Sequence, residues 1–531
     1  MSVFKNGILL LPGFPNKKYL YNILDEASKH IQSNLFIELT DFVDTKIQGD
    51  VHLVNNFREL VKNVYSRPQT VSRNVNVHVL LPPATDIKPS SKRELSKMLN
   101  VCIASKTLKQ TTQQLEQIVQ LRYNFKEFVM KYIDTKEDMI VSASEINLTQ
   151  TYPGVVIGGT FDRIHDGHKL LIATALLLAN DKITVGVSAN ELLQKKVLKE
   201  LIEPVDARIK NVIELIKDYK PGLNYKVVPL HDTCGPSGTD DDLQLLVVSE
   251  ETINGGPLVN ETRKQNGLQQ LDVLSIDIIA DDCRDVSASV NAEDKLSSSR
   301  QRIRELGVLR KESTRAKEPG RCYVIGMTGG IASGKSSVVK RFEKLGAYTI
   351  DCDKLGHSAY LPGRTAFKLI VEEFGKEILS VEGTVDRKKL GPIVFNNKER
   401  MKRLNEIVWP EIRQMRKEII EKVEADGKHD VIIFEGAVLF ESGWDKDANE
   451  IWCCVIPVEE AVQRLKDRNG LSEEQAMSRI ATQMTNQERV DRSNVVFSTL
   501  WEPEFTQTQV EKAWRLLNER IVRKKIPNCA L

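Results

Sequence analysis

A short apolar segment followed by glycines, a lysine and a serine lies at residues 323–336, Y-V-I-G-M-T-G-G-I-A-S-G-K-S. Glycine lets consecutive backbone N–H groups turn inward around a phosphate, because it has no Cβ in the way. A lysine can then bring a point charge to the outer phosphates, and the hydroxyl beside it can hold Mg²⁺. The pattern predicts an ATP phosphate site made of Gly329, Gly330, Ile331, Ala332, Ser333, Gly334, Lys335 and Ser336.

The residues on both sides of this loop have the context that a phosphate site requires. An apolar strand is predicted before the loop, and Val338, Val339, Phe342 and Leu345 recur at helical spacing after it, before Gly346. A glycine turn that binds nothing is the alternative, but a strand–loop–helix order favours the phosphate site.

Two aspartates follow the next predicted strand, Tyr348–Ile350. Asp351 and Asp353 are two positions apart, so in an extended chain they share a face at the carboxyl end of a strand, where open α/β sheets bind ligands. A carboxylate there can accept the proton of an attacking hydroxyl or order Mg²⁺ beside Ser336. The alternative is that both aspartates cap the following helix.

A second glycine turn lies in V-V-I-G-G-T-F-D-R-I-H-D-G-H, which begins at Val155 and precedes an apolar helix and the strand Ile183–Val187. This order predicts a βαβ unit with a parallel sheet. His165 and His168 share one face of the first helical turn, beside N–H groups that attract anions. With Gly167 leaving room for a phosphate, the pair can stabilise charge on the α-phosphate of a nucleotide. A capping turn with two exposed imidazoles is the alternative.

Hydroxyl and cationic groups cluster again in K-L-S-S-S-R at residues 295–300. Such a cluster can neutralise a departing pyrophosphate, although alone it could be a solvated loop. Together with the upstream motif it resembles the nucleotidyltransferase superfamily, and V-V-S-E-E-T at residues 247–252 adds a similarity to eukaryotic phosphopantetheine adenylyltransferases. Class I aminoacyl-tRNA synthetases share the two signatures, but the chain shows no zinc module and no basic extension for tRNA.

This resemblance implies a Rossmann-like domain in which His168 and Lys196 are catalytic. Thr160 and His168 are expected to contact the triphosphate, and a lysine to orient the substrate phosphate; Lys196 is favoured for this role and Lys195 is left open. The residues that the resemblance places at ATP or substrate are Gly158, Gly159, Thr160, Phe161, His165, Arg208, Ser297, Ser298, Ser299 and Arg300.

From Tyr323 to about Ile521 the chain resembles dephospho-coenzyme A kinases. The matching segments, besides the phosphate loop, are I-D-C-D-K-L-G-H at 350–357, A-V-L-F-E-S-G-W at 437–444 and R-L-K-D-R-N-G-L-S at 464–472. The resemblance implies that Lys335 and Asp353 are catalytic, with Asp353 as the general base, and that Asp351 joins Ser336 at Mg²⁺. We predict that a group of mostly basic residues in the later helices forms a lid over ATP; the alternative is an ordinary charged helix surface. These residues are Arg464, Arg468, Arg479, Gln483 and Arg489.

Composition narrows the classes of protein. With 75 basic and 73 acidic residues, no strong field favours a nucleic-acid or membrane-surface protein. The eight cysteines include no C-x-x-C pair, which is typical of free thiols in a reducing compartment. The apolar run Ile8–Leu11 is too short for a signal sequence or a membrane span. We expect a soluble cytoplasmic protein; an association with mitochondria is left open.

The predicted fold class is α/β throughout. We expect an α/β region of unknown function at residues 1–150, a nucleotidyltransferase domain at 151–308, a linker at 309–320 and a phosphate-loop kinase domain with a parallel sheet at 321–531. In the first region, residues 7–11 and 75–81 are predicted strands and residues 91–133 a helix.

Together the two resemblances imply a bifunctional coenzyme A synthase. Its substrates are expected to be ATP, 4′-phosphopantetheine and dephospho-CoA, with Mg²⁺ as cofactor; protein partners are left unknown. One alternative is a single active kinase whose degenerate nucleotidyltransferase-like module serves as a binding scaffold. Another is a kinase for a different small hydroxyl metabolite, because a phosphate loop does not specify the acceptor.

Overall fold

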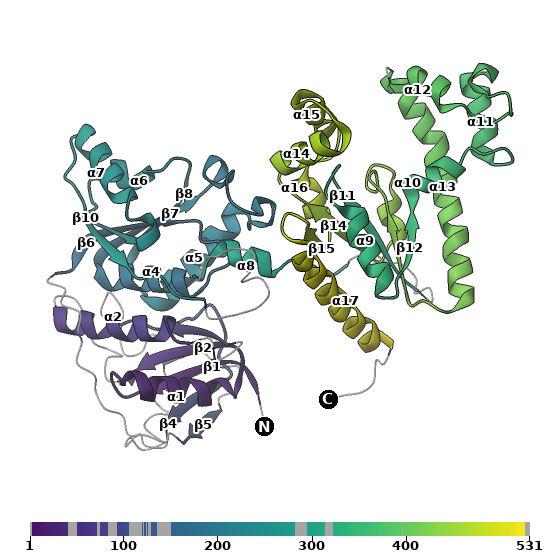
Figure 1. The fold of residues 1–531 in the computed structure, drawn as a ribbon. Helices are drawn as coiled ribbons and strands as arrows, with labels where there is room; N and C mark the ends of the chain where they lie inside the picture. Colours follow the sequence, from purple (N-terminus) through teal and green to yellow (C-terminus); the bar gives the residue numbers. More distant parts are fainter. Residues whose placement is uncertain are drawn as a thin grey trace. The chain divides into compact units, whose positions relative to one another are not determined.

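Contacts divide the chain into two compact units, Met1–Gln301 and Arg302–Leu531. The computed structural model, with the element labels of Figure 1, describes residues 3–40, 50–68, 70–71, 75–82, 93–105, 119–120, 122–123, 125, 129–134, 150–281, 295–313, 322–395 and 397–525. Within these ranges, no helix combines the length and apolar composition needed to cross a bilayer.

The first unit begins with a parallel sheet in the order β3-β2-β1-β4-β5. Its central strand is buried on both faces, as its unbroken apolar run predicts. The helix predicted for residues 91–133 is wrong at residues 101–105 and 130–133, which are strands; the run V-C-I-A-S is buried at every position, so it has no helical period. Residues 119, 120 and 122 are helical. The elements are β1 (Phe4–Leu11), α1 (Lys17–Ser28), β2 (Ile31–Leu39), α2 (Val51–Tyr65), β3 (Asn76–Val79), β4 (Val101–Ser105) and β5 (Met130–Ile133).

A second parallel sheet of the same unit has the order β10-β9-β6-β7-β8. Numbered from its own first strand, each sheet has the order 3-2-1-4-5 found in Rossmann-type folds, which confirms the predicted class of the second domain. The elements are β6 (Tyr152–Gly159), α4 (Asp166–Leu178), β7 (Ala179–Ser188), α5 (Val205–Tyr219), β8 (Asn224–Leu230), α6 (Gly235–Thr239), β9 (Leu245–Ser249), α7 (Gly255–Gln265), β10 (Asp272–Ile276) and α8 (Ser298–Arg304).

Helix α4 is apolar on all sides and is buried from Lys169 to Leu178. A helix with no polar face needs cover on every side. It packs on β6, β7 and β9 of its own sheet and on α2, which belongs to the first sheet's half of the unit (Figure 1). The start of α4, where the two histidines lie, is therefore held between the two halves of this unit.

The second unit is built on the parallel sheet β12-β13-β11-β14-β15, which confirms the predicted phosphate-loop kinase architecture. Because Met327 and Asp351 both pair with Glu435, the carboxyl ends of three strands meet at one edge. The elements are β11 (Tyr323–Gly329), α9 (Lys335–Lys344), β12 (Tyr348–Asp351), α10 (Cys352–Ser358), α11 (Thr365–Phe374), α12 (Arg387–Phe395), α13 (Lys398–Asp426), β13 (Val431–Glu435), β14 (Glu450–Val455), α14 (Val458–Asn469), α15 (Glu473–Ala481), α16 (Asn486–Arg492), β15 (Val495–Ser498) and α17 (Pro503–Lys525).

The segment just before the predicted linker is tied to the second unit. Gly307 N–H donates to the Val496 carbonyl at 2.9 Å, and Leu309 forms an antiparallel bridge with Val495. The segment thereby covers the edge strand β15, whose backbone would otherwise be open to pairing with another chain. Contacts divide the chain after Gln301, whereas the sequence places the domain end at 308; residues 314–320 of the predicted linker lie outside the described residues.

Replacing Gly307 with alanine should destabilise the second unit. Gly307 has φ +76°, and a Cβ there would lie 2.4 Å from the backbone oxygen of Gln509, so the pairing to β15 must shift. We expect a loss of about 1–3 kcal/mol in the free energy of unfolding. Tryptophan fluorescence can follow it, because all five tryptophans lie between residues 409 and 514.

Gly383 provides the matched control, since it has the same φ of +76° but nothing within 4 Å of the added Cβ. Gly383→Ala should lower the midpoint of thermal unfolding less than Gly307→Ala. Equal effects of the two substitutions would show that backbone strain alone, and not the clash with Gln509, determines the loss.

Candidate active sites

The loop between β11 and α9 is packed so closely that two of its glycines cannot be replaced. A Cβ on Gly329 would lie 2.5 Å from Ser333 Oγ and 2.8 Å from the Cys454 carbonyl. Gly334 has φ +79°, and its Cβ would lie 2.6 Å from Thr499 Oγ1. These are the two glycines that the sequence motif singles out, and the reason is contact as well as backbone freedom.

Lys335 and Ser336 meet a buried carboxylate at the carboxyl end of β13. Glu435 is 6% exposed, and its Oε2 accepts a hydrogen bond from Ser336 Oγ at 2.9 Å and lies 3.5 Å from Lys335 Nζ. Sequence reasoning missed this residue. The available signal was its place directly after the apolar strand Val431–Phe434, because an acid at a strand end beside the phosphate loop is suited to Mg²⁺.

The two aspartates after β12 have different surroundings. Asp351 is the N-cap of α10: its Oδ1 accepts the Lys354 N–H at 2.9 Å, and its Oδ2 lies 3.2 Å from Lys354 Nζ. Asp353 has a side chain 55% exposed, with Oδ2 3.8 Å from Lys335 Nζ. The capping interpretation therefore describes Asp351, and Glu435 takes the place beside Ser336 that was predicted for Asp351. Asp353 is free to face a substrate near Lys335.

Among the residues predicted for a lid, two hold the phosphate loop itself. Arg464 donates to the Ala332 carbonyl at 3.2 Å and to Thr499 Oγ1 at 2.8 Å, while Gln483 Oε1 accepts the Ile331 N–H at 2.9 Å. These bonds support a loop in which Ala332, with φ +61°, is in a strained conformation. Arg468 is exposed and donates to Asn469, and Arg489 is 2% exposed near Gly330.

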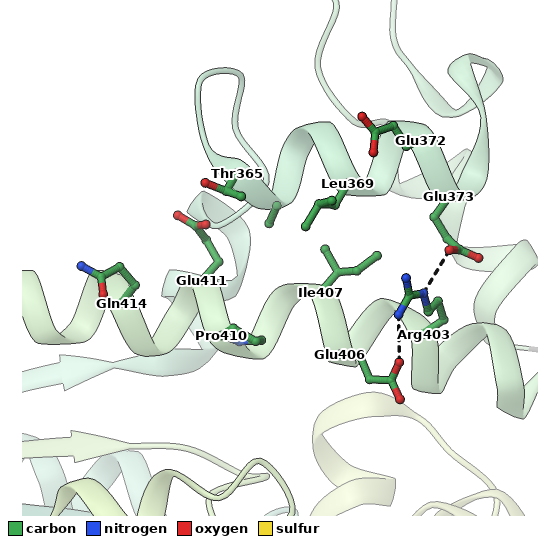
Figure 2. A pocket seen from close by; sticks show the side chains of 11 residues that line it. Thr365, Leu369, Glu372, Glu373, Arg403, Glu406, Ile407, Pro410, Glu411 and Gln414 are labelled. Atoms are coloured by element: carbon green, nitrogen blue, oxygen red, sulfur yellow. Dashed lines mark hydrogen bonds and ion pairs between the residues drawn. The ribbon is translucent and has the colours of Figure 1, made fainter.

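A groove of about 450 Å³ lies elsewhere in this unit, between α11 and α13 (Figure 2). Arg403 crosses it and pairs with Glu373 at 3.0 Å and Glu406 at 3.2 Å. Its lining is acidic, so it is not suited to a phosphate, and no residue predicted for the kinase site lines it. The lining residues are Thr365, Ala366, Leu369, Glu372, Glu373, Arg403, Glu406, Ile407, Pro410, Glu411 and Gln414.

In the first unit, His165 and His168 stack at the start of α4. Their ring centroids are 3.9 Å apart with an interplanar angle of 27°, and a Cβ on Gly167 would lie 3.1 Å from the His165 ring. Both rings are half-buried, and among the described residues neither Nδ1 atom has a hydrogen-bond partner. His165 makes no side-chain cap bond. The alternative of an exposed capping turn therefore does not describe this pair, because both Nδ1 atoms are buried and have no partner within the described part of the chain.

Both histidines are uncharged at neutral pH. Burial lowers the pKa of His165 to about 4, and burial together with the adjacent His165 lowers the pKa of His168 well below its usual value. A neutral imidazole has one donor and one acceptor nitrogen, so the pair can form directed hydrogen bonds to phosphate oxygens.

Arg208 holds the glycine turn before α4 through hydrogen bonds to its backbone. This guanidinium is 1% exposed and donates to the carbonyls of Thr160 at 2.6 Å and Ser188 at 2.9 Å. It is predicted to contact ATP or substrate, whereas these bonds position the backbone of Thr160. Phe161 is fully buried with φ +50°, and its ring centroid lies 5.3 Å from that of His168. Gly158 and Gly159 form the carboxyl end of β6.

The K-L-S-S-S-R segment is anchored near the histidine pair by two ion pairs. Lys295 pairs with Glu251, and Arg300 Nε lies 2.9 Å from Asp281 Oδ2. The charge of Asp281 raises the pKa of His165, as the smallest of the causes that act on it. Ser297 Oγ accepts the Arg300 N–H at 3.3 Å, and Ser298 and Ser299 open α8. Lys195 and Lys196 are both exposed, in the turn that follows a 3₁₀ helix, η2 (Asn190–Leu193).

The lowered pKa of His165 predicts an acid-sensitive first unit. Above pH 6.5 the ring is neutral in both the folded and the unfolded state. Between pH 6.5 and about pH 4, His165 is protonated in the unfolded chain but stays neutral in the folded site. The free energy of unfolding therefore falls as the pH falls through this range. We expect a loss of about 2 kcal/mol from His165 between pH 7 and pH 5.

Urea unfolding followed by circular dichroism at the two pH values measures this loss, with tryptophan fluorescence reporting the second unit separately. The His165→Gln variant should show a smaller difference between pH 7 and pH 5. An unchanged difference would mean that other groups cause the acid sensitivity.

Comparisons with known proteins agree with this division into sites. A family model described as "Dephospho-CoA kinase" matches residues 323–499, and one described as "Cytidylyltransferase-like" matches residues 156–304. The phosphopantetheine adenylyltransferase of Saccharomyces cerevisiae is 44% identical over 123 residues, which are 23% of this chain and 40% of that protein. The chain thus spans less than half the length of that relative.

Relatives of the second unit match over most of their length. The dephospho-CoA kinase of Carboxydothermus hydrogenoformans is 38% identical over 187 residues, 35% of this chain and 90% of that protein. The dephospho-CoA kinase of Geobacter sulfurreducens is 38% identical over 191 residues, 36% of this chain and 96% of that protein. The residues that the dephospho-CoA kinase family model matches, 323–499, contain the phosphate loop, Asp353, Glu435 and Arg464. The chain belongs to the dephospho-CoA kinase family.

Proposed function

We propose that the chain catalyses the last two steps of coenzyme A synthesis at two separate sites. The first transfers the adenylyl group of ATP to 4′-phosphopantetheine, and the second phosphorylates the ribose 3′-hydroxyl of the resulting dephospho-CoA. The proposal rests on the observation that each compact unit contains one of the two predicted sets of phosphate-binding residues, and each set lies inside the match to a different transferase family. The domains proposed for the two activities are residues 151–308 and 321–531.

In the first site, an oxygen of the 4′-phosphopantetheine phosphate attacks the α-phosphorus of ATP. The bond from this phosphorus to the bridging oxygen breaks, and pyrophosphate leaves. His168 and His165 hold the triphosphate with Thr160, and Lys196, with Lys195 as the alternative, orients the attacking phosphate. Ser297, Ser298, Ser299 and Arg300 stabilise the charge of the leaving pyrophosphate. Orientation and charge stabilisation suffice, because no covalent intermediate is needed.

In the second site, the loop from Gly329 to Ser336 holds ATP and Lys335 neutralises charge on the γ-phosphate. The 3′-hydroxyl attacks the γ-phosphorus, its proton passes to Asp353, and ADP leaves. The hydroxyl of Ser336 and the carboxylate of Glu435 are hard oxygen ligands of the kind that Mg²⁺ prefers, and they are 2.9 Å apart. When bound there, Mg²⁺ would offset negative charge on the outer phosphates.

The six described cysteines are all free thiols, which supports a reducing compartment. We therefore propose the cytoplasm as its compartment, and an association with mitochondria is left open.

One assay tests the proposal. The purified chain is incubated with ATP and Mg²⁺, in one arm with 4′-phosphopantetheine and in the other with dephospho-CoA, and the products are separated by chromatography. CoA and pyrophosphate in the first arm and CoA in the second support both sites. Product in the second arm alone would support the scaffold alternative, which the unpartnered histidine nitrogens do not favour. No product in either arm would point to a kinase for another hydroxyl acceptor.

A further inference from the structure

The two histidines at the start of α4 alternate with charged residues in the order His165-Asp166-Gly167-His168-Lys169. Lys169 is 2% exposed, so its ammonium group is withdrawn from water. Its three protons have three acceptors: Asp166 Oδ1 at 2.8 Å, the Val77 carbonyl at 3.0 Å, and Asn76 Oδ1. Two of these acceptors lie on β3, in the first 150 residues of the chain.

The carboxylate of Asp166 is likewise shared between the two halves of the unit. Its Oδ1 accepts from Lys169, and its Oδ2 accepts from Arg67 Nη1 at 2.9 Å. The same Arg67 nitrogen donates to the Val64 carbonyl at 2.7 Å, near the end of α2. Burial raises the pKa of Asp166, but the charges of Lys169 and Arg67 lower it by more. The net effect is a lowered pKa, so the carboxylate stays ionised.

These contacts restrict how the first turn of α4 can move. The Lys169 ammonium is 2% exposed, so it has no water to replace a lost partner, and a rotation of the helix start would leave this charge unpaired in a low-dielectric interior. The rings of His165 and His168 are carried on that same turn, one beside each charged residue. Packing of α2 along α4 adds apolar contact to the same junction.

We propose that the first 150 residues position the histidine pair, and that Arg67 and Asn76 are positioning residues for adenylyl transfer. This inference rests on the proposed function of the first site. It assigns a role to a region that carries none of the chemical motifs of the sequence. The region shares the strand order of the domain it supports, but at the end of its own first strand it has P-G-F-P-N-K-K where the other domain has the two histidines.

Arg67→Ala tests the proposal in the full chain. We expect kcat for adenylyl transfer to fall on the order of ten- to hundredfold, because small displacements of groups that act on the reacting phosphate have effects of this size. KM for ATP should change by less than about threefold, because the loss is in the transition state. Arg67→Lys keeps a cation near Asp166 and should restore part of kcat. Asn76→Ala removes one acceptor of Lys169 from a different element and should lower kcat as well.

Two controls separate positioning from general damage. Lys97→Ala removes an exposed pair with Glu214 at 3.5 Å, at another point between the same two halves of the unit, and should leave kcat unchanged. Circular dichroism melts confirm that each variant is folded at the assay temperature, and phosphorylation of dephospho-CoA by the same sample checks the amount of intact chain.

The outcomes distinguish failure of the proposed adenylyl transfer from failure of the positioning role. Absence of adenylyl transfer in the unmodified chain would reject the proposed function of the first site, and the inference with it. A normal rate in the unmodified chain together with unchanged kcat in folded Arg67→Ala and Asn76→Ala would reject the positioning role alone. A loss in Lys97→Ala as large as that in Arg67→Ala would also reject it, because any weakening of the junction would then suffice.

Discussion

Replacing Lys335 with alanine should reduce phosphorylation of dephospho-CoA by roughly 10²–10³ while adenylyl transfer continues, because one preorganised charge-stabilising group has an effect of that size. Lys335 Nζ lies between Glu435 at 3.5 Å and Asp353 at 3.8 Å, at the start of α9. The preceding loop is held in place by Thr499, which donates to the Ser333 carbonyl, and by Arg464, which donates to the Ala332 carbonyl. With 4′-phosphopantetheine and ATP as substrates, dephospho-CoA should therefore accumulate.

Chromatographic time courses of dephospho-CoA and CoA measure this effect. Lys340→Ala is the matched control, since Lys340 is an exposed lysine of the same helix. Equal loss of both half-reactions in folded Lys335→Ala protein would contradict the assignment of separate sites.

His168→Ala should have the reverse effect, with adenylyl transfer reduced by roughly 10²–10³ and phosphorylation of added dephospho-CoA retained. The neutral imidazole of His168 is stacked on His165, and in the proposed mechanism it holds the triphosphate, so its loss removes a directed hydrogen bond to the substrate. Pyrophosphate release in the presence of 4′-phosphopantetheine measures the loss. His52→Ala, at an exposed position of α2, is the control.

A mixture of the two variants makes a sharper test. Lys335→Ala chains should supply dephospho-CoA, and His168→Ala chains should phosphorylate it, so CoA should form from 4′-phosphopantetheine although neither variant produces it at an appreciable rate alone. Failure of the mixture, with each remaining half-reaction intact when assayed separately, would mean that the intermediate does not pass between chains.

Local patterns predicted the parts of the fold that depend on local chemistry. The phosphate loop was recognisable because its glycines, lysine and serine must be consecutive to surround a phosphate, and strands such as Val431–Glu435 were recognisable as short apolar runs. A helix is predicted over residues 91–133 from a mixture of polar and apolar residues with no clear period, whereas pairing with β1 makes Val101–Ser105 within that range a strand. The sequence of a single segment does not show which distant strand it pairs with.

Contacts between distant segments decided the remaining features of both sites. Asp351 and Glu435 are both acids at strand ends, and from the sequence either could lie beside Ser336. In the fold, Asp351 caps α10 and Glu435 accepts the hydrogen bond of the serine hydroxyl. In the same way, Arg208 is a residue type that often binds phosphate, but in the fold its guanidinium donates to backbone carbonyls.

The sequence by itself determined which chemistry this protein can perform, because the reacting groups of each site lie in short motifs whose spacing reflects the shape of a phosphate. It did not determine how those groups are held. Arg67 and Asp166 are 99 positions apart, and nothing near either residue predicts their ion pair. Only the tertiary structure decides such pairings, because the burial that makes a charge need a particular partner does not exist until the chain has folded.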